Sequence, residues 1–146
     1  MGKILLRNII LNNQDSDILV SEGLIAKIAP AGASDCDMTD VEVMDCEGKT
    51  AVPGFVNMHT HAGMAMMRGV GEDIAFHEWL DRIWVLEEGL DEEYVYHATR
   101  VACLEMIKTG TVCFYDQYWM IDTAVKAISD MGLRSLNPYV FLDLFD

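Results

Sequence analysis

The chain has 146 residues, of which 51% are hydrophobic and 23% are charged. This composition excludes a disordered, collagen-like or low-complexity chain and provides enough apolar material for a buried core. Lys and Arg together number 10 against 24 Asp and Glu, so the formal net charge is -14. Such an acidic chain is not expected to bind nucleic acid or a membrane surface. No apolar run reaches the ~18 residues of a membrane span, and no segment has the pattern of a signal peptide.

The four cysteines are far apart in the sequence and form no Cys-x-x-Cys pair: Cys36, Cys46, Cys103 and Cys113. This spacing matches neither a zinc knuckle nor a dense disulfide framework. We therefore expect buried, reduced thiols and a cytoplasmic location.

Residues 1–52 have the patterns of strands and turns. Lys3–Leu11 is rich in apolar and β-branched residues, and residues 17–20 and 24–28 flank a Ser-Glu-Gly turn as the two arms of a hairpin. Val41–Asp45 alternates apolar and polar residues with a period of two. These segments predict a small antiparallel β unit.

Residues 53–146 alternate strands and helices. A Pro-Gly turn leads into an apolar strand over residues 55–59, which we expect to be buried on both faces. The patterns then predict a helix over 74–88, a helix capped by Asp91 that ends at Gly110, a strand over 111–115, a helix over 121–131 and a strand over 135–142. This α/β order indicates a parallel sheet with right-handed crossovers. A closed (β/α)8 barrel needs about 250 residues, so these units fit its first part.

The sharpest chemical signal is the His59-Thr60-His61 motif at the carboxyl end of the first strand of this α/β region. Residues i and i+2 of a strand point to the same side, so both imidazoles can bind one metal ion. In parallel α/β folds the catalytic groups collect at this end of the strands. Two histidines cannot complete the coordination of zinc, so further ligands must come from elsewhere.

The segment from Ala51 to His61, a Pro-Gly turn and a strand followed by His-x-His, resembles the start of the barrel in the amidohydrolase superfamily. That superfamily also begins with part of a small β-sandwich, which residues 1–52 would supply. Further segments resemble the branch of 5-methylthioadenosine/S-adenosylhomocysteine deaminases and chlorohydrolases, including 64–69, 78–80, 83–87 and 105–116. The resemblance covers nearly the whole chain. It implies the first three βα units of a TIM-like barrel, with the rest of the barrel absent from this chain.

The resemblance also implies a metal-dependent hydrolase that activates water to deaminate a purine nucleoside or related heteroaromatic ring. His59 and His61 would bind one divalent metal ion, with zinc preferred and iron as the alternative. Glu87 would contact the ribose hydroxyls of the substrate and Trp79 would line its pocket. The other metal ligands and the proton-shuttling glutamate come from later strands of the family, so no catalytic acid or base is expected within this segment, which alone would be inactive.

Several alternatives stay open from the sequence. The same water-activating centre serves dechlorinating hydrolases and cyclic-amide hydrolases, and Asn137-Pro138-Tyr139 stand where adenosine-deaminating relatives have a substrate-binding arginine. A non-catalytic α/β module is the alternative from another class. The expected partners are a small-molecule substrate and either a second copy of the chain or the C-terminal part of the same protein. Trp119 is predicted to be a packing anchor, because most aromatic residues serve a core.

Overall fold

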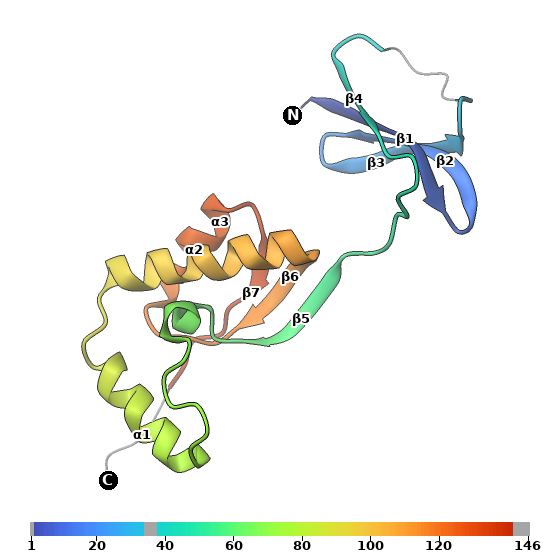
Figure 1. The fold of residues 1–146 in the computed structure, drawn as a ribbon. Coiled ribbons are helices and arrows are strands. Elements are labelled where there is room, and N and C mark those ends of the chain that lie inside the picture. The colour runs from blue at the N-terminus through green and yellow to red at the C-terminus, as the bar shows by residue number, and fades with distance from the viewer. Residues whose placement is uncertain (1, 34–37, 142–146) are drawn as a thin grey trace. The chain divides into compact units, whose positions relative to one another are not determined.

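The computed structural model describes residues 2–33 and 38–141, and the chain separates into two compact units, Met1–Pro53 and Gly54–Asp146 (Figure 1). In its described residues the first unit contains strands and turns but no helix, whereas the second contains a parallel sheet with helices. None of the helices in the described ranges has both the length and the apolar character needed to cross a bilayer.

The first unit is a four-stranded sheet in the order β3-β2-β1-β4. Its strands are β1 (Lys3–Leu11), β2 (Gln14–Ser21), β3 (Leu24–Pro30) and β4 (Val41–Asp45). The hairpins β1–β2 and β2–β3 are antiparallel as predicted, and Gly23 adopts the positive φ of 77° that the second turn requires. The prediction of a wholly antiparallel unit is wrong for β4, which pairs with β1 in parallel. The connection between β3 and β4 brings the chain back to the end of the sheet where β1 begins, so β4 runs parallel to β1.

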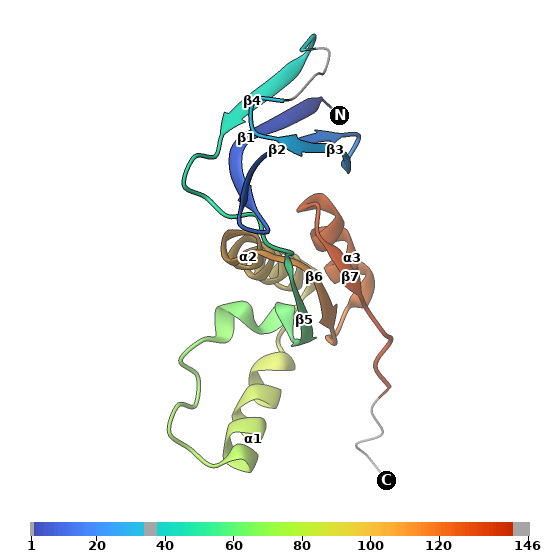
Figure 2. The same ribbon diagram turned by 90° about the vertical axis from the view of Figure 1, so that its right-hand side faces the viewer.

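The second unit has a parallel sheet in the order β5-β6-β7. Its strands are β5 (Phe55–Thr60), β6 (Thr111–Asp116) and β7 (Arg134–Leu136), and its helices are the 3-10 helix η1 (Ala62–Met67), α1 (Phe76–Glu87), α2 (Glu92–Thr109) and α3 (Ile121–Asp130). Figure 2 shows the same elements from the side. The predicted order of strands and helices is confirmed.

Helix α2 is the main covering element of this sheet and packs on η1, α3 and β6. It begins where the Asp91 carboxylate accepts a hydrogen bond of 2.8 Å from the Tyr94 N–H, and it ends at Gly110 with φ 85°. Its inner side buries Ala102, Cys103 and Met106 against Phe114 of β6 and Ile128 of α3. The predicted cap and helix end are both confirmed.

Two predictions about the strands of this sheet are wrong. The last strand ends at Leu136 rather than extending over 135–142, because Pro138 lacks an N–H for the ladder and fixes its own φ; Leu142 lies outside the described residues. Strand β5 is also not buried on both faces, since Phe55 and Met58 are each 65% exposed. It lies at an edge of the sheet, and no described element of this unit pairs with its free side.

The thiols follow the prediction in part. Cys46 and Cys103 are buried and free, whereas free Cys113 is only partly buried and Cys36 lies outside the described residues. Burial, helped by the nearby Asp116 carboxylate, raises the pKa of the Cys103 thiol to about 11. Because the thiolate is the nucleophilic form, the raised pKa keeps Cys103 in its less reactive thiol form near neutral pH.

Candidate metal and substrate site

A cavity of about 470 Å³ lies within the second unit, and every site residue predicted from the sequence lines it. Its wall contains His59 and His61 from the end of β5, together with Trp79 and Glu87 from α1. The rest of the lining is mostly apolar and aromatic: Met64, Phe76, Leu80, Ile83, Trp84, Gln117, Tyr118, Trp119 and Val140. The fold therefore brings together residues separated by up to 81 positions, from His59 to Val140.

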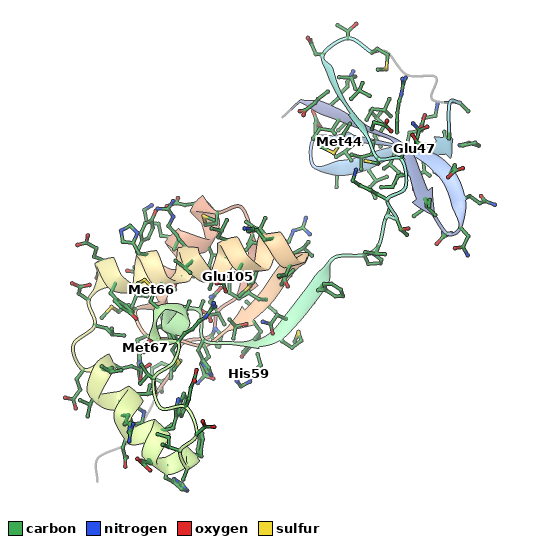
Figure 3. All side chains as sticks on the ribbon, viewed as in Figure 1. Met44, Glu47, His59, Met66, Met67 and Glu105 are labelled. Carbon is green, nitrogen blue, oxygen red and sulfur yellow. The ribbon has the colours of Figure 1, made fainter. Side chains whose placement is uncertain are left out.

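The two histidines lie at the carboxyl end of β5, where Figure 3 labels His59 on the opposite side of the strand from α2 in that view. Their ring centroids are 5.0 Å apart and the rings are nearly perpendicular. The His61 Nδ1 atom lies 2.7 Å from the Gln117 carbonyl oxygen. Because a carbonyl can only accept, Nδ1 carries the proton and donates it, which leaves Nε2 with a free lone pair.

This arrangement fits a metal ion on the histidine pair. Metal-binding histidines commonly donate their second ring N–H to a carbonyl or carboxylate, and the Gln117 carbonyl serves this purpose for His61. Within residues 2–33 and 38–141, however, no group of three or more His, Cys, Asp or Glu side chains is placed to hold a metal. The described residues would therefore offer a metal ion the histidine pair and no third protein ligand.

Asp116 fixes the turn that follows the histidines. Its side chain is 2% exposed, and its Oδ1 accepts a hydrogen bond of 2.7 Å from the Ala62 N–H at the start of η1. Burial raises the pKa of the Asp116 carboxyl, although this hydrogen bond and the nearby His61 oppose the shift. The carboxylate thus joins the end of β6 to the turn after β5.

We expect Asp116→Asn to gain stability relative to the parent protein as the pH rises. A carboxyl whose pKa is raised by folding contributes stability that is complete below its unfolded pKa and is lost as the pH passes its folded pKa. Asparagine has no such titration. Thermal unfolding of both metal-free proteins between acid and neutral pH checks this, and a difference in melting temperature that is independent of pH would contradict it.

The close contact between Gly63 and the Tyr118 ring also restrains the turn after β5. A Cβ atom on Gly63 would lie 2.0 Å from Cε1 of the Tyr118 ring, so only glycine leaves room for the ring in this position. The Tyr118 side chain therefore packs against the turn after β5 and also lines the cavity.

Gly63→Ala should therefore destabilise the protein by about 1–3 kcal/mol, the usual cost of overpacking a tight contact. Urea unfolding measures the effect. Gly89→Ala is the matched control, because its Cβ would meet nothing closer than the Leu86 carbonyl oxygen at 3.7 Å. Equal stability of the two variants would contradict the role assigned to the Gly63 contact.

Helix α1 supplies the aromatic side of the cavity. The Phe76 and Trp79 rings stack with centroids 5.9 Å apart and an interplanar angle of 23°. Glu87, at the last turn of the same helix, brings a carboxylate to an otherwise apolar wall. A planar apolar ligand with a polar hydroxyl edge would match this combination of surfaces.

Sequence reasoning missed the contribution of the loop after β6. Trp119, predicted to be a packing anchor, donates its indole N–H to Glu87 Oε2 at 3.1 Å, and Gln117 and Tyr118 also line the cavity. One signal was available in the sequence: these residues directly follow a parallel strand at the end where sites form.

The alternating strands and helices of the second unit are those expected of the first part of an α/β barrel. The sequence model of the amidohydrolase family matches residues 50–146, and the chain belongs to this family. A 5'-deoxyadenosine deaminase of Methanococcus maripaludis is 40% identical over 144 residues, covering 98% of this chain and 34% of the relative. The corresponding 5'-deoxyadenosine deaminase of Methanocaldococcus jannaschii is 38% identical with the same coverage. The chain thus spans about a third of the length of the curated relatives it matches.

Solved structures show the same fold. An atrazine chlorohydrolase of Arthrobacter aurescens, crystallised with zinc, matches 92% of this chain and 35% of its own with a TM-score of 0.75 at 22% identity. An adenosine deaminase of Xanthomonas campestris with bound zinc matches 92% of this chain and 32% of its own with a TM-score of 0.70 at 26% identity. The predicted fold class, the opening βα units of a hydrolase barrel preceded by part of a β-sandwich, is confirmed.

Proposed function

We propose that the protein containing this chain is a metal-dependent aminohydrolase that deaminates an adenine-type nucleoside. The observation that carries the proposal is the shared cavity, in which a histidine pair suited to metal faces a carboxylate and stacked aromatic rings. The similarity to 5'-deoxyadenosine deaminases over 98% of the chain supports the same reaction.

In this proposal His59 and His61 hold one divalent cation through their ring nitrogens, with zinc as the first choice and iron as the second. Two of the similar solved structures contain zinc. When bound, such a cation acts as a Lewis acid that makes water a competent nucleophile near neutral pH. The chain's own contribution is to orient the pair: the Gln117 carbonyl holds the His61 ring, and Asp116 holds the turn that follows it. The remaining ligands and the proton-transferring residue would come from later barrel strands.

The substrate would be recognised mainly from α1. Trp79 would pack against the substrate, and the Glu87 carboxylate, with two acceptor oxygens, would accept hydrogen bonds from vicinal ribose hydroxyls. The remaining wall is largely apolar, which favours a nucleoside with an apolar 5' end over one with a polar group there. The names of the curated relatives agree with this preference.

The test is a deamination assay on the complete protein with added zinc, in which ammonia release is followed for 5'-deoxyadenosine, adenosine and atrazine. We expect ammonia from both nucleosides, with higher kcat/KM for 5'-deoxyadenosine. Chloride release from atrazine without deamination would instead identify a chlorohydrolase, the activity named for one similar structure. Absence of activity on all three compounds, and on cyclic amides, would overturn the proposal.

The proposal includes no nucleic acid and no membrane as partner, and its polypeptide partner is the remainder of the barrel or a second copy of the chain. Free thiols at Cys46, Cys103 and Cys113 support a reducing, cytoplasmic compartment.

A further inference from the structure

We propose that Trp119 is a positioning residue for substrate recognition, which acts by holding the Glu87 carboxylate through its indole N–H. This inference rests on the proposed function and adds to it a residue from the loop between β6 and α3. The inference is based on the hydrogen bond of 3.1 Å between Trp119 Nε1 and Glu87 Oε2, which joins residues 32 positions apart.

The hydrogen bond restrains the Glu87 carboxylate and leaves it acceptor sites for a ligand. An indole N–H is a donor only, so it can pair with the carboxylate and with no donor on a ligand. Trp119 uses one acceptor site on Oε2, so Oε1 and the second lone pair of Oε2 are left to accept from the substrate hydroxyls. A bond to a charged acceptor is stronger than one between neutral groups, so it restrains the torsions of the long glutamate side chain.

The loop that carries Trp119 is itself fixed on both sides. Before it, the Tyr118 ring is seated on Gly63, where no Cβ would fit. After it, Met120 has φ 50° and ψ 51°, the left-handed region that side chains other than glycine, asparagine and aspartate rarely adopt. Such strain persists only where the surroundings determine the conformation, and it concentrates at functional sites. The conformation of the loop therefore directs the Trp119 side chain toward Glu87.

The Tyr118 hydroxyl also lies near this carboxylate. Tyr118 is 7% exposed and lines the cavity. Burial and the nearby Glu87 carboxylate raise the pKa of Tyr118, so its hydroxyl keeps its proton and can donate it toward that carboxylate. The loop thus brings two donors, the Trp119 indole and the Tyr118 hydroxyl, close to Glu87.

The test is Trp119→Phe in the complete protein, because phenylalanine keeps an aromatic ring and removes the donor. Two substrates are compared, 5'-deoxyadenosine and its analogue that also lacks the 2'- and 3'-hydroxyls. We expect kcat/KM for 5'-deoxyadenosine to fall about tenfold, mainly through a higher KM, while the analogue lacking the diol is deaminated as before. Glu87→Ala should abolish the difference between the two substrates, and adding Trp119→Phe to it should cause no further loss.

The outcomes separate the possible failures. An equal loss for both substrates, or additive losses in the double variant, would assign Trp119 to packing and overturn the inference while deamination stands. An unchanged KM for 5'-deoxyadenosine would do the same. A parent protein that deaminates neither compound would overturn the proposed function, and the inference with it. Thermal unfolding of each variant confirms that the differences come from the site and not from loss of the fold.

Discussion

The variant His59→Ala of the complete protein should lose its metal ion and its turnover together. His59 and His61 are the histidines of the cavity wall, and the chain offers no third ligand among its described residues to compensate for a missing one. Loss of a residue that only orients a ligand typically reduces metal affinity or activity by about 10–100-fold. Removing a ligand itself should exceed that range. Elemental analysis after dialysis and ammonia release from 5'-deoxyadenosine measure the two quantities.

The matched control is His97→Ala. His97 is an exposed residue of α2 that does not line the cavity, and its ring packs edge-on against that of Tyr96. This variant should retain both metal and turnover. If His59→Ala kept its metal and its activity, the histidine pair would have no part in the mechanism, and the proposed metal centre would be wrong.

Residues 1–146 expressed alone should self-associate. Strand β5 has an unpaired edge, and its side chains Phe55, Val56 and Met58 are 65%, 57% and 65% exposed. An exposed apolar edge strand pairs readily with another chain. The acidic net charge of -14 opposes association only at long range and is screened at physiological salt. Sedimentation velocity should therefore show species larger than the 16.4 kDa monomer.

A charge on the edge strand should reduce this association, so Val56→Lys is the informative variant. Val101→Lys is its control, because Val101 is an exposed residue of α2, at 37%, and lies away from the strand edge. A monodisperse monomer of the parent chain with cooperative unfolding would contradict the prediction. Equal effects of the two lysines would show that net charge, and not the edge, controls association.

The parts of the fold that could be predicted are those that depend on short-range patterns in the sequence. The Asp91 cap, the glycine that ends α2 and the period-two strands all depend on neighbours a few residues away. Long-range pairing was less accessible: β4 joins β1 in parallel, which the alternation of Val41–Asp45 alone cannot distinguish from an antiparallel partner. The early end of β7 was readable in principle, because Pro138 stands inside the predicted strand.

In the candidate site, too, local features could be predicted from the sequence and long-range contacts could not. His59 and His61 were identified because their spacing and their place after a strand are both local features of the sequence. The bond from Trp119 to Glu87 and the seat of Tyr118 on Gly63 join segments 32 and 55 positions apart, so no local pattern contains them. The roles of Glu87 and Trp79 came from family resemblance, and the structure adds that both residues line the cavity that the histidines share.

The residues that line the cavity come from separate elements, and this separation bears on how substrate recognition could change. The histidines are carried by β5 and the turn after it, whereas Phe76, Trp79 and Glu87 all belong to α1, whose only fully buried residue is Ile83. The residues that would recognise a substrate and those that would hold a metal ion thus belong to different elements of the second unit. Under the proposed function, changes confined to residues 76–87 would alter substrate recognition and leave the histidine pair in place.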